Sequence, residues 1–158
     1  MVKFKRFYLF LTVFPILVSC DDDNDCCTII EAGIEFVANI DGEDYFSTID
    51  RDGIAIFNFN GETYELVNGP DRDSSKGYSI IPPDASNGNG YIVFVGLNIE
   101  HIESDNTSLT RIAWTPNDID NVKAIFDRSN NNLIVIEVQI EGETVWTVSE
   151  GGLVVLNK

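Results

Sequence analysis

Apolar and polar residues alternate with a period of two along most of the chain from residue 29 onward. One segment has an apolar residue at every second position: Ile34, Phe36, Ala38 and Ile40. This period is typical of a β-strand that buries one side and exposes the other. Short apolar runs recur between clusters of glycine, asparagine and aspartate, which favour turns. The sequence therefore predicts about ten strands and no long amphipathic helix.

Three dipeptides between such segments are typical of tight hairpins: Asp41-Gly42, Asn60-Gly61 and Glu141-Gly142. A two-residue turn of this type requires positive φ at both positions. The first turn predicts that Ala38 pairs with Tyr45, and the third predicts that Val138 pairs with Val145. In that register Trp146 lies on the face opposite Val138.

Two other segments carry specific expectations. Residues 90–99 are almost all apolar, which predicts a central strand covered on both faces. Residues 115–122 predict one helical turn, with Thr115 as its N-cap and Pro116 at its first position. The whole pattern predicts a single all-β domain, an antiparallel meander of about ten strands that forms a β-sandwich or a barrel.

The composition narrows the class of protein. Hydrophobic residues make up 44% of the 158 residues, with ten Phe, five Tyr and two Trp, which disordered chains lack. The 26 acidic residues outnumber the 10 basic ones, so the net charge is −16. Such a surface repels phosphate backbones and anionic lipid headgroups. We therefore expect no nucleic-acid partner and no membrane contact through surface charge.

The first 20 residues follow a different pattern. Lys3, Lys5 and Arg6 precede an apolar run of 12 residues, 7–18. As a helix this run would reach ~18 Å, which is short of a hydrocarbon core of ~30 Å, so it is typical of a secretory signal. The run ends in Leu17-Val18-Ser19-Cys20, which resembles the lipobox of bacterial lipoproteins.

The lipobox resemblance implies that residues 1–19 form a signal peptide that is removed. It also implies that Cys20 is lipidated, with acyl chains such as palmitate that make the membrane a partner. Residues 20–28 are then an acidic tether, and residues 29–158 are a single β domain. The alternative is an ordinary signal peptide with an incidental cysteine. The location that follows from the lipobox is the outer membrane or the cell surface.

Four of the five residues after Cys20 are aspartates. In some Gram-negative lineages such a run resembles the export signal of surface lipoproteins, and in others it resembles a retention signal of the inner membrane. A third interpretation is a solvated, extended tether. Residues 38–46, ANIDGEDYF, are similar to the first hairpin of small β-rich envelope lipoproteins of uncharacterised function. That resemblance implies nothing about activity.

Cys26 and Cys27 are adjacent, which restricts what they can form. Neighbouring Cα atoms lie ~3.8 Å apart, below the usual ~4.4–6.8 Å of a disulfide. The pair is therefore free, linked to another molecule, or joined in a strained vicinal bridge. Two thiols alone are a poor zinc site, because zinc takes about four ligands.

The sequence carries no catalytic signature. His101 is the single histidine, and a nucleophile–histidine site would have to use it. The chain has no nucleophile elbow and no phosphate loop. Three acidic segments, 50–53, 71–75 and 118–121, offer oxygen ligands, but none completes a calcium-binding loop. We expect no catalytic residue, no metal and no cofactor.

Three functions remain open. The first is a non-catalytic binding or interaction module, with a glycan, a peptide or an envelope protein as its ligand. The second is an extracellular hydrolase that acts on glycans through paired carboxylates. The third is a structural envelope component without a ligand. An exposed aromatic platform would favour binding, and a cleft with two facing carboxylates would favour hydrolysis.

One long connection is the expected place of ligand contact. Residues 68–90 contain a single short apolar piece, YSII, which predicts an edge strand before two prolines. The segment holds Arg72 and Lys76, which are basic positions on an acidic protein, and Tyr78, whose ring offers a stacking face. These three residues are the candidate ligand contacts.

Overall fold

The computed structural model describes residues 28–69, 74–84 and 90–158. The signal peptide, Cys20, the Cys26–Cys27 pair and Arg72 lie outside this part. The strands within it are β1 (Ile30–Glu31), β2 (Gly33–Ile40), β3 (Glu43–Asp44), β4 (Ala55–Phe59), β5 (Tyr64–Leu66), β6 (Tyr78–Ile81), β7 (Ile92–Gly96), β8 (Thr107–Thr115), β9 (Asp118–Asp127), β10 (Leu133–Ile140), β11 (Glu143–Thr147) and β12 (Val154–Asn157). Three short 3-10 helices accompany them: η1 (Tyr45–Ser47), η2 (Arg51–Gly53) and η3 (Ser129–Asn131).

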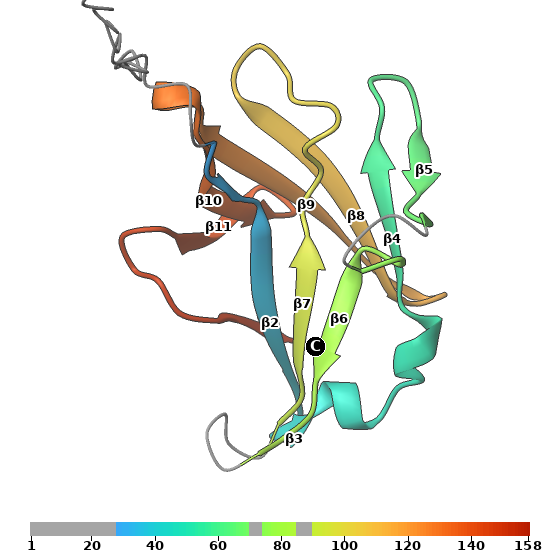
Figure 1. Cartoon of the computed structure of the whole chain (residues 1–158). Coiled ribbons are helices and arrows are strands. Elements are labelled where there is room, and N and C mark those ends of the chain that lie inside the picture. The colour runs from blue at the N-terminus through green and yellow to red at the C-terminus, as the bar shows by residue number, and fades with distance from the viewer. Residues whose placement is uncertain (1–27, 70–73, 85–89) are drawn as a thin grey trace, which may run out of the picture.

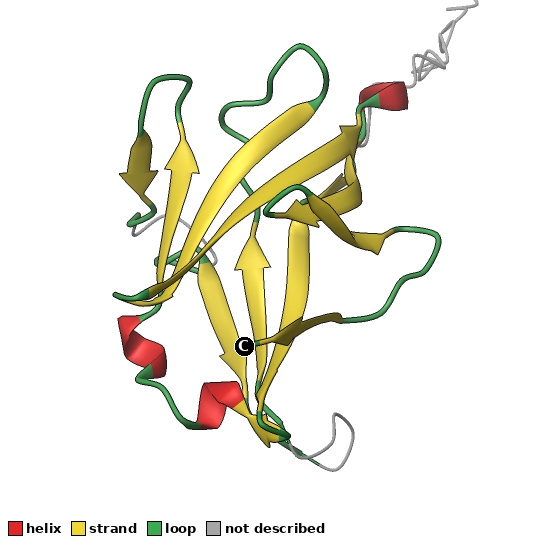
Figure 2. Ribbon diagram, turned by 180° about the vertical axis from the view of Figure 1, so that it is seen from behind, coloured by secondary structure: helices red, strands yellow, loops and turns green. Residues whose placement is uncertain are grey.

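The strands form two curled sheets that face each other, which confirms the all-β prediction (Figures 1 and 2). The first sheet has the order β1-β10-β9-β8-β4-β5, with β11 on β10. The second has the order β12-β2-β7-β6, with β3 on β2. Most neighbours are antiparallel, as a meander requires. However, β1 pairs with β10 and β12 pairs with β2 in parallel, because these segments return from elsewhere in the chain.

The core fills the space between the sheets. Alternate residues of β8 are buried, and its last inward side chain, Trp114, is fully enclosed. The Trp114 ring centroid lies 5.6 Å from that of Phe36 and 5.2 Å from that of Phe46. Aromatic groups in such tilted or edge-on pairs add to the stability that burial supplies. Burial therefore alternates along the strands as predicted. The physical reason is that one side of each sheet packs against the other sheet.

The first hairpin follows the predicted turn but not the predicted length. Asp41 and Gly42 have φ of 51° and 85°, and Ile40 pairs with Glu43. The predicted pairing of Ala38 with Tyr45 is wrong, because β3 ends at Asp44. The Asp44 carboxylate accepts a hydrogen bond of 3.0 Å from the amide of Phe46, which caps η1 and turns the chain into the core.

The third hairpin contains a bulge that the sequence did not reveal. Its turn is as predicted, with φ of 51° at Glu141 and 87° at Gly142. The register then shifts between Val138 and Gln139, so that Val138 pairs with Trp146 and not with Val145. One extra residue moves every later side chain to the other face. The predicted face of Trp146 is therefore wrong: the ring shares a face with Val138 and packs against the core.

The second hairpin is not a two-residue turn. Phe59 pairs with Tyr64, so residues 60–63 form a four-residue loop. The amide of Asn60 donates to the carbonyl of Thr63 at 3.0 Å, and the Asn60 side chain accepts from the amides of Glu62 and Thr63. Only Gly61 of the predicted pair has positive φ, at 100°. The asparagine side chain closes this loop in place of the second left-handed residue.

Substitution of Gly61 is expected to cost more stability than substitution of Gly42 or Gly142, the glycines of the other two predicted hairpins. A Cβ on Gly61 would lie 2.8 Å from Cε1 of His101, whereas one on Gly42 or Gly142 would meet nothing within 4 Å. Left-handed backbone alone costs an alanine about 1 kcal/mol, and displacement of the imidazole adds about 1 kcal/mol more. We expect Gly61→Ala to lower the free energy of unfolding by about 2 kcal/mol in urea titrations. Equal losses for Gly61→Ala and Gly142→Ala would contradict this account.

Two further expectations are corrected. Residues 115–122 contain no helical turn, because Thr115 pairs with Asp118 across a tight turn between the long strands β8 and β9. Residues 90–99 do supply a central strand, β7, between β2 and β6. Its outer face is covered only in part, however, since Ile92 is buried whereas Phe94 is 36% exposed. The Phe94 ring lies over Gly33, where a Cβ would come within 2.0 Å of its Cζ.

A network of polar groups joins the end of β12 to the first sheet. The ammonium of Lys158 lies 2.9 Å from Oδ1 of Asp118 and 2.6 Å from Oδ2 of Asp120. The hydroxyl of Tyr45 donates to Asp118 at 2.6 Å, and the indole N–H of Trp114 donates to Asp120 at 2.6 Å. These five residues are named the lysine network. Among the described residues no helix is long and apolar enough to span a bilayer.

Candidate functional site

A cleft of about 310 Å³ is lined by the β4–β5 hairpin and by the loop between β7 and β8. Figure 1 shows these two segments at the same end of the sandwich. Four asparagines, two glutamates and the single histidine contribute to its walls. We name it the amide cleft after these residues: Asn58, Asn60, Asn68, Asn98, Glu65, Glu100 and His101. Phe59, Leu66 and Val67 add apolar surface.

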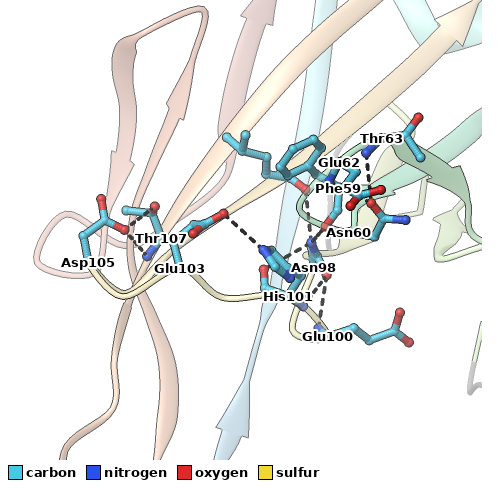
Figure 3. A network of polar contacts seen from close by, with 11 residues as sticks. Phe59, Asn60, Glu62, Thr63, Asn98, Glu100, His101, Glu103, Asp105 and Thr107 are labelled. Atoms are coloured by element: carbon cyan, nitrogen blue, oxygen red, sulfur yellow. Dashed lines mark hydrogen bonds and ion pairs between the residues drawn. The ribbon is translucent and has the colours of Figure 1, made fainter.

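Asn98 holds the two sides of the amide cleft together. It is fully buried, and its Nδ2 donates to the carbonyls of Phe59, Leu109 and His101 at 2.8, 3.3 and 3.4 Å. Its Oδ1 accepts from the amides of Glu100 and His101 at 3.1 and 3.3 Å. Figure 3 shows this side chain at the centre of the contacts. A loop fixed in this way gives the cleft a preformed wall.

His101 stands at the rim of the amide cleft. Its Nε2 lies 3.1 Å from Oε1 of Glu103, and its ring packs edge-on against Phe59 with centroids 6.2 Å apart (Figure 3). The side chains of His101 and Glu103 are 38% and 51% exposed. Gly61 allows this packing because it has no Cβ to collide with the imidazole. The partner of the histidine is thus a carboxylate, in an arrangement that orients the ring.

Asn60 and Glu65 form the outer wall on the hairpin side. The Nδ2 of Asn60 donates to Oε1 of Glu65 at 2.6 Å, while its Oδ1 closes the hairpin loop. Both residues are exposed. The amide therefore orients a solvent-facing carboxylate toward the mouth of the cleft.

Asn58 lies deeper, on the inward side of β4. Its neighbour on the same side is the core residue Ile56, and Asn58 itself is only 8% exposed. Its Oδ1 is buried and accepts no hydrogen bond; within the described part of the chain, Ser108 Oγ is the other buried side-chain oxygen without a partner. An unsatisfied buried polar atom costs about 1–3 kcal/mol and calls for an explanation.

A second hollow of about 390 Å³ adjoins the amide cleft and shares Asn58 and Val67 with it. Its other walls are mainly apolar, and they include Leu97 and Ile99. Asn58 therefore stands between a polar cleft and an apolar hollow. A ligand that reaches Asn58 meets both kinds of surface.

The structure places two of the three predicted contact residues side by side: the ammonium of Lys76 lies 5.9 Å from the centroid of the Tyr78 ring. Lys76 lines a smaller hollow of about 200 Å³ that shares Leu66, Val67 and Asn68 with the amide cleft, and its Nζ donates to the carbonyl of Asp52 at 3.0 Å. Tyr78 is 7% exposed and donates to the carbonyl of Arg51 at 3.0 Å, so its ring is part of the core. Arg72 lies outside the described residues. The predicted edge strand YSII is β6, at the end of its sheet.

Among the described residues, the carboxyl groups with clearly shifted pKa values are all shifted downward. The hydroxyl of Thr107 lowers the pKa of Asp105, and the amide side chain of Gln139 lowers the pKa of Glu137. The backbone amide of Asn121 lowers the pKa of Glu141. Each hydrogen bond favours the charged form. None of these three groups has the raised pKa that a general acid of a glycosidase needs.

In the described part of the chain, acidic side chains of the segments considered as calcium-binding loops already have other partners. The Asp50 carboxylate caps η2 by accepting from the amide of Asp52 at 3.2 Å. Asp118 and Asp120 lie in β9 and bind Lys158. In the described residues no group of three or more His, Cys, Asp or Glu side chains is placed to hold a metal ion.

Comparison with known proteins identifies no relative: no family model, no curated protein and no solved structure matches the chain. The amide cleft therefore stands on its geometry alone. Sequence reasoning singled out neither Asn58 nor Asn98. A signal existed in both cases, because each asparagine interrupts an otherwise apolar strand segment.

Proposed function

We propose that this chain is a lipid-anchored lipoprotein of the outer membrane or cell surface and that it acts as a non-catalytic binding module. The observation that carries the binding function is the amide cleft, whose walls carry asparagine side chains and are held together by the buried side chain of Asn98. The lipobox at Cys20 supports the anchor.

The chemistry of the cleft favours binding over hydrolysis. Asparagine side chains neither accept nor release protons near neutral pH, and they dominate the polar wall. Glu65 is engaged by Asn60, and His101 is engaged by Glu103. These contacts hold donors and acceptors in place, which serves recognition more directly than proton transfer.

The anchor would keep the amide cleft close to the membrane. Thr28, where the described chain starts, lines a hollow together with Ile99, and Ile99 also borders the hollow beside Asn58. The tether thus begins at the same end of the sandwich as the cleft. From Cys20 to Thr28 a fully extended chain spans at most about 30 Å. The end of the sandwich that carries the cleft is then expected to face the lipid surface.

Lipidation is expected to depend on Cys20 alone. Cells that express the full chain and are fed an alkyne fatty acid should label the wild-type protein and a Cys26→Ala variant equally. The Cys20→Ala variant should lose the label, because the lipobox cysteine is the acceptor of the diacylglyceryl group. Equal labelling of wild type and Cys20→Ala would show that the leader is an ordinary signal peptide.

Site-specific photo-crosslinking in intact cells tests the binding function. A photoreactive phenylalanine at Glu62, an exposed residue of the β4–β5 loop beside the cleft, should form adducts with an envelope glycan or protein. The same group at Ser47, an exposed residue of η1 at the opposite end, is the matched control. Equal adducts at both positions, or none at either, would contradict binding at the cleft. New reducing ends in a glycan incubated with the protein would favour the hydrolase instead.

A further inference from the structure

We propose that the folded domain docks end-on onto a zwitterionic lipid bilayer through apolar side chains that lie where the tether begins. The inference rests on the lipid anchor in the proposed function, and it adds the surface of the domain that touches the lipid. We name this surface the isoleucine patch. Its members are Ile29, Ile30, Ile99, Ile102 and Leu133.

The members of the isoleucine patch come from three segments that the fold brings together. The carbonyl of Ile29 accepts a hydrogen bond of 2.8 Å from the amide of Leu133, and Ile30 pairs with Leu133 in the parallel ladder of β1 and β10. Ile99 and Ile102 lie in the loop between β7 and β8. They line one hollow of about 410 Å³ with Leu133 and Thr28, and Ile99 shares a second hollow with Ile30. The start of the described chain and this loop lie at the same end of the sandwich (Figure 1).

The patch is unusually exposed for its composition. Ile30 is 57% exposed, Ile29 is 48% and Ile99 is 40%, and these are three of the nine large apolar side chains that are exposed in the described residues. A single exposed isoleucine is ordinary, whereas several that adjoin mark a contact surface. Adjacent strand residues point to opposite sides, so Ile29 and Ile30 meet the lipid together only if the domain approaches end-on.

The tether indicates the bilayer as the occupant of this surface. Thr28 follows the eight residues 20–27, and a chain of that length keeps the patch within about 30 Å of an anchored Cys20. Four of these eight residues are aspartates, whose charged side chains are poor cover for apolar surface. Docking of an anchored domain is an intramolecular step, so the high effective concentration of lipid makes a weak apolar contact sufficient.

The charges around the patch favour a zwitterionic bilayer. Arg128 is exposed and lines the same hollow as Ile99 and Leu133, where its guanidinium is placed for a lipid phosphate at headgroup depth. Glu31 and Asp127 are exposed next to it along the chain, and the ammonium groups of choline or ethanolamine compensate such carboxylates. Anionic lipid would repel a protein of net charge −16. The contact is thus apolar, in keeping with the expectation of no membrane contact through surface charge.

Photo-crosslinking to lipid tests the docking. The lipidated full-length protein, with a photoreactive phenylalanine at Ile30 or at Ile99, is reconstituted into phosphatidylcholine vesicles and irradiated. The matched control position is Ile119, which is 47% exposed and lies at the other end of β9 from Arg128, about 26 Å from Asp127 at ~3.3 Å per residue. Mass spectrometry is expected to find acyl-chain adducts at Ile30 and Ile99 that exceed those at Ile119 about tenfold. Vesicles of phosphatidylglycerol should give fewer adducts at both patch positions.

A double variant tests whether the apolar side chains cause the docking. Ile29→Ser with Ile30→Ser should reduce the lipid adducts at position 99 about tenfold, since apolar burial supplies the contact. The control pair is Val148→Ser with Val155→Ser, which removes apolar groups of 54% and 56% exposure from outside the patch and should leave those adducts unchanged. Both pairs are expected to melt near the wild-type temperature, because all four side chains are about half exposed. If the first pair fails to fold, Ile99→Ser with the photoreactive group at Ile30 takes its place.

Three outcomes would overturn the inference. Equal lipid adducts at Ile30, Ile99 and Ile119 would show a domain without a preferred orientation. Adducts to a second protein chain, or to residues 20–27 of the same chain, in place of lipid would show that another occupant covers the patch. Unchanged adducts in the Ile29→Ser, Ile30→Ser variant would show that these side chains do not hold the domain on the bilayer.

Failure of the docking is distinguishable from failure of the proposed function. If the alkyne fatty acid labels Cys20 and the patch gives no preferential lipid adducts, the anchor stands and the docking alone is wrong. If Cys20 carries no label, the anchor and the docking fall together. Adducts of a glycan or a protein at Glu62 decide the binding function in either case.

Discussion

Replacing Asn98 with alanine is expected to lower the free energy of unfolding by about 3–5 kcal/mol and to abolish ligand binding. The change removes five hydrogen bonds of one fully buried side chain. The carbonyls of Phe59 and Leu109 lose a donor, and the amides of Glu100 and His101 lose an acceptor. Each such group left unsatisfied costs about 1–3 kcal/mol, and entry of water recovers part of the sum. Urea denaturation monitored by tryptophan fluorescence measures the loss.

The matched control is Asn117→Ala. Asn117 lies in the exposed turn between β8 and β9, and its loss is expected to change stability by less than about 0.5 kcal/mol. Asn98→Asp tests the donor side separately. It keeps an acceptor for the two amides but directs a carboxylate at three carbonyl oxygens, so we expect it to be no more stable than Asn98→Ala. A loss below about 1 kcal/mol in Asn98→Ala would refute the central role of this side chain.

The sequence was informative where a single strand and its turn determine the structure. The alternation at residues 34–40 identified β2, and the turns at Asp41-Gly42 and Glu141-Gly142 have the expected positive φ. Period and turn chemistry are local, so they can be read without knowledge of the rest of the fold. The order of the strands, and the parallel pairing of β12 with β2, depend on contacts distant in sequence and left no local signal.

The wrong predictions share a cause: a side chain or a partner strand overrode the local pattern. Asp44 ended β3 by capping η1, and the Asn60 side chain replaced a second left-handed residue in its loop. The residues after Thr115 have the composition of a helix start, yet they pair with β8. The many backbone hydrogen bonds of a long β-ladder stabilise the chain more than one isolated helical turn does. Tertiary context decides such cases.

The amide cleft was outside the reach of sequence reasoning for a related reason. The prediction placed ligand contacts in one long connection, residues 68–90, because length and basic residues are visible in a sequence. The cleft includes Asn68 and Gly69, the first two residues of that connection, but it is assembled mainly by Asn98 and the hairpin that ends β4. These two parts are joined by a hydrogen bond across 39 positions. Pairing of that kind is determined by the fold. The informative signal was the interruption of apolar strand patterns by Asn58 and Asn98.

Removal of Lys158 is expected to have the second-largest effect. Asp118 and Asp120 lie two positions apart in β9, and the side chains of Lys158 and Asp120 are only 13% and 14% exposed. In Lys158→Met both carboxylates keep their burial and lose their counter-charge. Breaking a fully buried pair costs about 3–5 kcal/mol, and since Asp118 is 28% exposed we expect about 2–4 kcal/mol at neutral pH.

A double-mutant cycle tests whether the loss comes from the uncompensated charge. Asp120→Asn removes one carboxylate and keeps a group that accepts from the Trp114 indole. Lys158→Met combined with Asp120→Asn should therefore lose less stability than the sum of the two single variants, by about 1 kcal/mol or more. Additive losses would show that Lys158 contributes mainly through Asp118, 2.9 Å away, or through its contact with the Trp114 ring, 5.8 Å away.

Alkaline pH tests the lysine network through Tyr45, whose hydroxyl donates to Asp118. Burial raises the pKa of Tyr45, and the hydrogen bond to Asp118 raises it further. In the unfolded chain a tyrosine ionises near pH ~10. A raised pKa in the folded state gives a stability contribution that is complete below this pH and is lost as the pH rises toward the folded-state value. We therefore expect stability above pH ~10 to fall more steeply in the wild type than in Tyr45→Phe. Equal slopes in unfolding titrations would mean that the phenol ionises as easily in the folded protein as in the unfolded chain.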